Sequence, residues 1–182
     1  MTVSIVSGFE NLFKVMRGCI EAEITDEGIL KDVETFIPIY LEEEHVEEPV
    51  VWMYQLETTP SRGADISQTM ELTTPFQFNC AIYESDIEDS NTSAQNLACR
   101  VVIAILNNWQ RVQSDLLPGQ RMIKNITLDR YYPLETIEVN GKSERLPVIG
   151  VRLNVNHLIN WKLCCRVIDD NNNNNEEVND GE

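Results

Sequence analysis

The chain has 182 residues, with 14 Lys and Arg against 30 Asp and Glu, which gives a formal net charge of -16. The length suggests one domain, and 42% hydrophobic residues are too many for a chain that is disordered throughout. The charge argues against a protein that grips nucleic acid through clustered Lys and Arg, and against docking on an anionic membrane surface, but a protein that lines a path for DNA remains open.

The N-terminal region predicts an amphipathic helix over Ser4–Ile24. Its apolar residues recur every three or four positions, and charged residues occupy positions between them. The apolar members are Ile5, Phe9, Leu12, Met16 and Ile20. We expect this stripe to pack on the core of the protein.

A second helix is predicted directly afterwards, ending at Pro38. Thr25 is a suitable N-cap, and Asp26 and Glu27 in the first turn would favour the positive end of the helix dipole. The buried stripe of this helix would consist of Ile29, Val33 and Ile37. An acidic segment follows, Glu42–Glu48, in which five carboxylates surround His45.

Two strands are predicted next. Val50–Leu56 is rich in β-branched and aromatic residues. The polar loop Glu57–Gln68 separates it from Met70–Tyr83, in which apolar and polar residues alternate. Because Pro75 donates no backbone hydrogen bond, the second strand should lie at a sheet edge or carry a bulge.

The most regular helix of the chain is predicted after a polar, acidic loop over Glu84–Ser93. Thr92 and Gln95 match a capping box, in which two side chains satisfy free backbone N–H groups at a helix start. Apolar residues recur at helical spacing up to Val112, so this helix should lie on the sheet. The turn dipeptide Pro118–Gly119 follows it.

The last part of the chain predicts two more strands. The first covers Met122–Tyr132, and Asn140-Gly141 is a strong hairpin signal. The second, Ile149–Cys165, alternates over seventeen residues, which exceeds the usual strand of about 3–10 residues. We expect it to bend or to extend beyond the domain.

The order of elements predicts an α+β fold, in which two N-terminal helices and one central helix pack on an antiparallel or mixed β-sheet. We expect a single domain over residues 1–168. The acidic tail, residues 169–182, contains five consecutive Asn, six carboxylates and no Lys or Arg. Such a segment cannot bury apolar surface, so we expect it to be disordered.

The cysteines favour neither a disulfide framework nor a zinc site, because their number is odd and no CxxC spacing occurs; they are Cys19, Cys80, Cys99, Cys164 and Cys165. No signal peptide is visible, and no apolar run approaches the roughly 20 residues of a membrane span. We therefore expect a protein made in the cytoplasm with reduced thiols and without a membrane partner.

Four features of the sequence could act as chemical sites. The cluster Glu42–His45 lacks a defined ligand spacing, so a solvated acidic loop is the better interpretation than a metal site. His157 lies on an apolar strand face and is expected to be structural. A bond between Cys164 and Cys165 would be strained, and the tryptophans (Trp52, Trp109 and Trp161) lie on apolar stripes and are expected in the core or an interface. We therefore predict no catalytic, cofactor-binding or metal-binding residue, no cofactor, and a protein that is not an enzyme.

The lengths of the predicted strands are then the main guide to function. Long strands leave unpaired edges, and edges invite pairing with another subunit, which suggests a ring or tube. The order of elements over Ser4–Val167 resembles that of phage tail terminators, also called tail completion or neck proteins. The resemblance is carried by VVWMYQLETTPSRG from Val50, PFQFNCAIYES from Pro75, AQNLACRVVIAILNNW from Ala94 and VIGVRLNVNHLINWKL from Val148.

The resemblance implies a virion protein of the bacteriophage neck or tail that forms a homo-hexameric ring. Such a ring caps the tail tube, contacts the tail tube protein and the head-side connector or stopper protein, and lets DNA pass through its lumen without specific binding. An acidic bore would repel DNA phosphates, and the loops Glu57–Gln68 and Glu84–Ser93 would suit docking to neighbouring rings. The chain departs from the family in its second N-terminal helix, its acidic segment near Glu42 and its tail.

Because of these departures, other neck or tail components remain possible, such as a head-side stopper or a tube subunit. Two other classes also remain. An acidic soluble adaptor or inhibitor would bind a basic protein with strong salt dependence. A carboxylate-dependent metalloenzyme would show a metal-dependent rise in melting temperature that Glu42 to Glu44→Ala removes.

Overall fold

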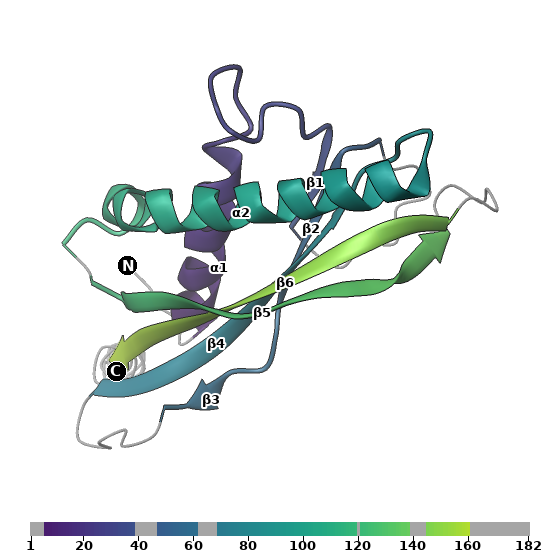
Figure 1. The fold of residues 1–182 in the computed structure, drawn as a ribbon. Coiled ribbons are helices and arrows are strands. Elements are labelled where there is room, and N and C mark those ends of the chain that lie inside the picture. The colour runs from purple at the N-terminus through teal and green to yellow at the C-terminus, as the bar shows by residue number, and fades with distance from the viewer. Residues whose placement is uncertain (1–5, 39–46, 62–68, 120, 139–144, 161–182) are drawn as a thin grey trace, which may run out of the picture.

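The computed structural model describes residues 6–38, 47–61, 69–119, 121–138 and 145–160. These residues form two helices and six strands, and all six strands belong to one sheet. Both helices lie on the same side of the sheet (Figure 1). In chain order the elements are α1 (Val6–Glu21), β1 (Thr35–Ile37), β2 (Val50–Gln55), β3 (Thr59–Pro60), β4 (Thr69–Ala81), α2 (Ile87–Leu116), β5 (Ile123–Glu138) and β6 (Arg145–Asn160).

The sheet has the strand order β1-β2-β4-β6-β5, and β3 pairs with β4 beside β2. It is mixed, because β1 is parallel to β2 while every other pair is antiparallel. The longest ladder joins β4 to β6, from Thr69 opposite Asn160 to Ala81 opposite Val148. The predicted α+β class and the alternating strands over β4 and β6 are confirmed.

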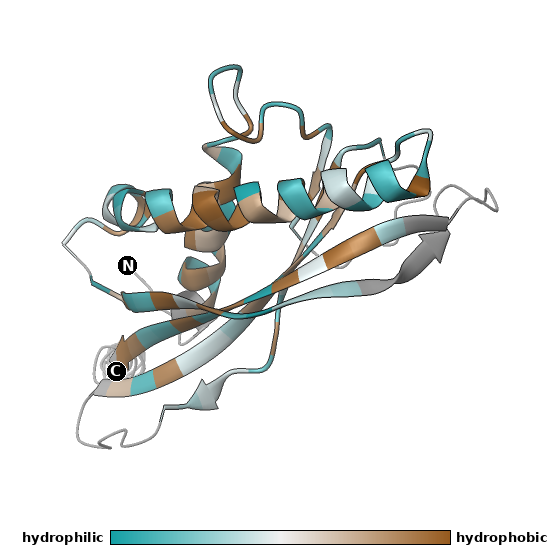
Figure 2. Cartoon of the chain, viewed as in Figure 1, coloured by the Kyte–Doolittle hydropathy of each residue, from teal (hydrophilic) through white to brown (hydrophobic). Residues whose placement is uncertain are grey.

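The main core lies between the sheet and the two helices. Its largest fully buried side chains on the sheet include Phe76 and Phe78 of β4 and Leu153 of β6. α1 packs against α2 closely enough that a Cβ on Gly18 would lie 2.9 Å from Cγ1 of Val112. Figure 2 shows the resulting division between apolar bands that face the inside and hydrophilic residues on the outer side of α2.

The predicted second helix is wrong. Residues 22–34 form turns, and Thr35–Ile37 form β1 beside β2. The backbone of Gly28 approaches Glu23 so closely that a Cβ there would lie 2.1 Å from the Glu23 carbonyl oxygen, while that oxygen accepts the N–H of Leu30 at 3.0 Å. Leu30 and Val33 are buried without a helix, Ile37 is buried as part of β1, and Ile29 is exposed. Tertiary contacts therefore override the helical spacing.

The long helix begins earlier than predicted, because Asp86 and not Thr92 is its N-cap. Its N-cap is Asp86, whose side chain accepts the N–H of Glu88 at 2.7 Å, so much of the predicted loop Glu84–Ser93 is helical. The buried Ser90 hydroxyl donates to the Asp86 carbonyl at 2.8 Å and accepts the N–H of Glu84 at 2.9 Å. Glu88 and Asp89 also favour the positive end of the helix dipole.

Pro75 does not mark an edge strand, since β4 is paired on both sides along most of its length. Its carbonyl accepts the N–H of Leu56 at 2.9 Å, so its nitrogen also points toward the β2–β3 side. Pro75 lies between the last register pair of β2, Gln55 with Phe76, and the first of β3, Thr59 with Thr73. The missing N–H therefore falls at the junction of two partner strands.

β5 and β6 form a long hairpin whose predicted turn at Asn140-Gly141 lies outside the described residues. β5 is interrupted by register shifts between Ile123 and Asn125 and between Leu128 and Arg130, with a third near Leu134. Two of the predicted boundaries move outward: β5 runs past Tyr132 to Glu138, and β6 begins at Arg145. The short β3 occupies part of the predicted loop Glu57–Gln68.

Candidate functional surfaces

Of the residues weighed as chemical sites, the structure places only some. His157, Trp52 and Trp109 lie within the described residues, while Glu42–His45, Trp161 and Cys164–Cys165 lie outside them, as does the acidic tail. Trp52 is buried in a small apolar cluster with Val50 on the face of the sheet opposite the helices, and Trp109 packs at the margin of the main core. The expected structural roles of these two tryptophans are confirmed.

His157 lies on the helix-covered face of β6 with no exposed surface. Its Nε2 lies 2.8 Å from Oγ1 of Thr74, and this hydroxyl lies 2.8 Å from Oγ1 of Thr58. The ring of Phe9 contacts the imidazole edge to face, at 6.1 Å between centroids. Desolvation lowers the pKa of His157 from 6.5 to about 4, so the imidazole is neutral at ordinary pH.

This arrangement supports a structural histidine. A general base usually has a pKa near the working pH and an orienting partner, but Nδ1 of His157 is buried without a hydrogen-bond partner among the described residues. The polar chain Thr58–Thr74–His157 instead joins the segment before β3 to β4 and β6 beneath the N-terminal part of α1.

The opposite face of the sheet, called here the open face, carries no described helix (Figure 1). A row of hydrogen bonds crosses it: Ser61 Oγ lies 3.0 Å from Thr73 Oγ1, which donates to Asn156 Oδ1 at 2.7 Å. Asn156 Nδ2 then donates to Asn125 Oδ1 at 2.7 Å. These uncharged groups satisfy one another, so the row leaves few donors for an outside ligand.

A second row on the open face contains two arginines. The bulge at Asp129 brings Arg130 opposite Arg152, whose Nη2 donates to Gln77 Oε1 at 3.3 Å. Arg130 also pairs with Asp129 at 3.1 Å, and Nε of Arg152 is buried without a partner among the described residues. Nearby, Tyr132 lies over Gly150, where a Cβ would come within 2.8 Å of the ring.

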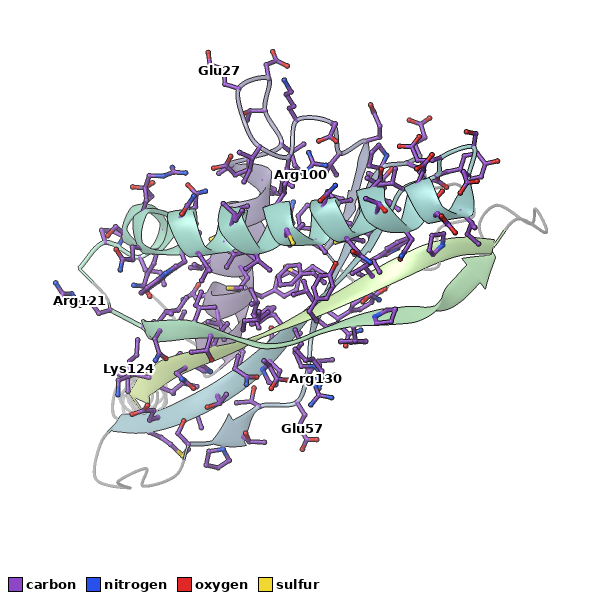
Figure 3. All side chains as sticks on the ribbon, viewed as in Figure 1. Glu27, Glu57, Arg100, Arg121, Lys124 and Arg130 are labelled. Carbon is purple, nitrogen blue, oxygen red and sulfur yellow. The ribbon has the colours of Figure 1, made fainter. Side chains whose placement is uncertain are left out.

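Acidic residues are distributed unequally between the segments that contain the two edges of the sheet. The segment from residue 23 to 57, which contains β1 and β2 at one edge of the sheet, holds eleven acidic residues and one Lys. The segment from Arg121 to Glu138, which includes all of β5 at the other edge, holds three basic and three acidic residues. Figure 3 shows Glu27 and Arg100 on the helix side of the molecule, and Arg130 and Glu57 on the opposite side.

The thiols differ in exposure. Cys19 and Cys80 are buried, and desolvation raises the pKa of the Cys19 thiol to about 12 and that of the Cys80 thiol further, so both are unreactive. Cys99 is exposed on α2. Within the described ranges, no group of three His, Cys, Asp or Glu side chains is placed to hold a metal ion. In the same ranges, no helix has the length and apolar character needed to cross a membrane.

Sequence reasoning found the polar face of β4 and β6 but not its cross-strand contacts. The alternation separated Thr73 from Thr74 and Asn156 from His157, yet nothing in the spacing gave the register that joins Thr73, Asn156 and Asn125. That register depends on a bulge in β5. Comparison with known proteins finds no matching family model and no matching curated protein.

Proposed function

We propose that this chain is a structural virion protein of a bacteriophage neck or tail. Its role would be that of a tail terminator: a homo-hexameric ring that caps the tail tube and joins it to the head-side connector. The observation that carries the proposal is the part of the open face formed by β4, β5 and β6, where amides and hydroxyls bond to one another and whose other side is closed by α1 and α2.

The open face suits a surface along which DNA slides. Its amides and hydroxyls are partnered with each other, as in the row of Thr73, Asn156 and Asn125. Affinity for DNA comes largely from Lys and Arg that neutralise phosphates, and the described cations of this face include Lys124, paired with Glu71 at 2.7 Å, and the two arginines of the second row. DNA would touch such a lumen without being held.

The distribution of acids changes the expected form of the ring. Exposed carboxylates gather at the start of α2, among them Asp86, Glu88 and Asp89, and around β1 and β2 rather than on the rows of the open face. With the open face toward the lumen, the bore would be polar and nearly neutral instead of acidic. The carboxylates would then meet neighbouring subunits, the tube protein or the connector.

Imaging with mass measurement tests the proposal. Purified protein should give six-fold particles with a central hole of about DNA width in negative stain, and a mass of six chains. If it stays a monodisperse monomer at high concentration, and also with tube protein present, the proposal fails. An adaptor would instead give a monomer or dimer that binds a basic protein and releases it as salt rises.

A further inference from the structure

Two arginines lie side by side on the open face. Arg152 of β6 is directly opposite Arg130 of β5, and Gln77 of β4 is the partner of Arg152 on its other side. Residues paired in this way share one face of the sheet, with Cβ atoms about 4.5–5.5 Å apart. Like charges in such a position are destabilising, so the fold alone gives no reason for this pair.

Arg152 has no anionic partner among the described residues. It takes part in none of the ion pairs that these residues form, and its hydrogen bond with them runs from Nη2 to Gln77 Oε1 at 3.3 Å. Its Nε is buried without a partner there. Nε and Nη2 form the side of a guanidinium that bonds an oxyanion through two parallel N–H groups. In Arg152 this side meets only a neutral amide at long distance.

Arg130 adds a second guanidinium, which is partly engaged. Its Nε donates to Asp129 Oδ2 at 3.1 Å, and its side chain is 59% exposed on the side of the molecule opposite the helices (Figure 3). Exposed ion pairs of this kind contribute little free energy, so another anion can replace the carboxylate. The two Nη groups of Arg130 bond to no other described residue.

Other carboxylates of this region lie further from the two arginines. Glu135 follows Arg130 by five residues along β5, and Glu57 is separated from β5 by β4 and β6. Asp129 is therefore the carboxylate that competes with an outside anion for this pair.

We propose that Arg130 and Arg152 bind a phosphate group on the open face. Two adjacent guanidiniums offer more N–H groups than the two oxygens of a carboxylate can accept, whereas a tetrahedral phosphate has oxygens for both. The phosphate would bond to Nε and Nη2 of Arg152 in place of the Gln77 carbonyl, and to the Nη groups of Arg130. This inference goes beyond the proposed function, because both arginines belong to one chain and the site needs no ring.

Two sources supply such a group: the backbone of DNA and free phosphate. A backbone contact carries no sequence information. One such contact in each subunit of a ring would leave DNA free to slide, because the contact is the same at every base pair.

The first test compares melting temperatures in inorganic phosphate and in chloride at equal ionic strength. A ligand that binds only the folded chain raises the melting temperature. Phosphate should raise it by a few degrees more in the wild type than in the variant Arg130→Gln with Arg152→Gln. Phosphate also stabilises proteins in general, and the comparison of the two chains removes this effect.

The matched control is Arg17→Gln with Arg111→Gln, which removes two exposed arginines from the helices. It should respond to phosphate like the wild type. Equal responses of the wild type and the Arg130 and Arg152 variant overturn the site.

Asp129→Asn tests the competition at Arg130. This variant keeps both arginines, so it tests the site even if the double variant folds poorly. The phosphate affinity, taken from the dependence of melting temperature on phosphate concentration, should rise about two- to fivefold, as expected for the loss of an exposed ion pair. An unchanged or lower affinity would show that phosphate does not contact Arg130 and would overturn the proposal.

A labelled DNA duplex distinguishes the two sources of phosphate. If the backbone is the ligand, fluorescence anisotropy at low salt should show binding that is about tenfold weaker in the double variant, with a shallower salt dependence, and unchanged in the control. If phosphate acts through the arginines while the duplex binds both chains alike or not at all, free phosphate is the ligand.

The outcomes separate this inference from the proposed function. Hexameric rings whose response to phosphate is the same in the double variant overturn the site and leave the ring intact. A monomeric wild type whose response to phosphate is lost in the double variant supports the site and overturns the ring. A monomeric wild type without that response overturns both.

Discussion

The two faces of β4 are made by alternate residues of one strand, yet they differ in burial and in polarity. Phe76 and Phe78 point under the helices with no exposed surface, while Gln77 and Asn79 between them lie on the open face and bond to each other at 3.0 Å. Each face also carries a threonine: Thr74 is buried beside His157, and Thr73 is half-buried beside Asn156. The same type of side chain is therefore buried at Thr74 and partly accessible to water at the neighbouring Thr73.

The difference shows which face specifies the fold and which is free for another task. On the covered face every change of volume or polarity meets neighbours that cannot move away. On the polar rows of the open face water can replace a lost partner, so side chains there can vary with little effect on the free energy of unfolding. The polar rows of the open face and the edges of the sheet are therefore the regions most free to serve a function other than folding.

The largest expected contrast compares neighbours on the two faces. Phe76→Ala should lower the free energy of unfolding by about 3–5 kcal/mol, because it removes a fully buried ring and leaves a cavity. Gln77→Ala should change it by less than about 1 kcal/mol, since water can solvate the groups it leaves. Urea unfolding of both variants measures the difference, and equal losses would show that the open face is covered in solution.

The next contrast concerns acidity on the covered face. The pKa of His157 is about 4 in the folded state against 6.5 when unperturbed, so between these values the unfolded chain binds more protons. The free energy of unfolding should therefore rise with pH across this window. A contribution of about 3 kcal/mol is fully present above pH 6.5 and lost as pH falls toward 4.

His157→Gln serves as the control for this pH dependence, because the carboxylates that also titrate near pH 4 are unchanged. Urea unfolding from pH 4 to pH 8 should give a shallower slope for the variant than for the wild type. Identical slopes would mean that the imidazole is hydrated in the folded protein.

A smaller contrast compares the two threonines. Thr74→Val removes the hydroxyl between half-buried Thr58 and buried His157 and leaves the buried Nε2 of His157 without its partner, which should lower the free energy of unfolding by about 1–3 kcal/mol. Thr73→Val breaks the row on the open face, where water is available, and should lower it by about 0.5 kcal/mol. Thermal melting measures both, and a reversed order would contradict the assignment of the faces.

The sequence predicted those features that follow from the regular spacing of apolar and polar residues. Alternation assigned both faces of β4 and β6 because a side-chain period of two leaves no other arrangement of an exposed strand. It failed at residues 25–38, where the apolar spacing fits a helix but the close approach of Gly28 to Glu23 requires a turn. It also misplaced the start of α2, where Thr92 and Asp86 both have capping sequences and only the contacts of Ser90 favour Asp86.

The exposed apolar side chains of α2 and β5 were harder to predict for a different reason. Leu106 belongs to a helical stripe that looks like core, and its exposure follows from the position of α2 relative to the edge of the sheet. The location of the acidic segment 23–57 at one edge also needs the strand order, in which three strands separate β1 from β5. Composition alone gave only the net charge of -16.

The bulge at Asp129 has a consequence for how this strand can change in length. Leu128 pairs with Leu153 and Arg130 pairs with Arg152, so the two residues that flank Asp129 already face consecutive partners. Deleting Asp129 should therefore leave the side chains beyond it on their present faces, with a change in melting temperature of only a few degrees. Deleting Thr127, which has its own partner Asn154, should also close the bulge, but it would put Leu128 opposite Asn154 on the open face and Asp129 opposite Leu153 on the covered face, so the melting temperature should fall further. Thermal melting of the two deletions, followed by circular dichroism, would show whether this edge loses a residue at less cost at Asp129 than two positions earlier.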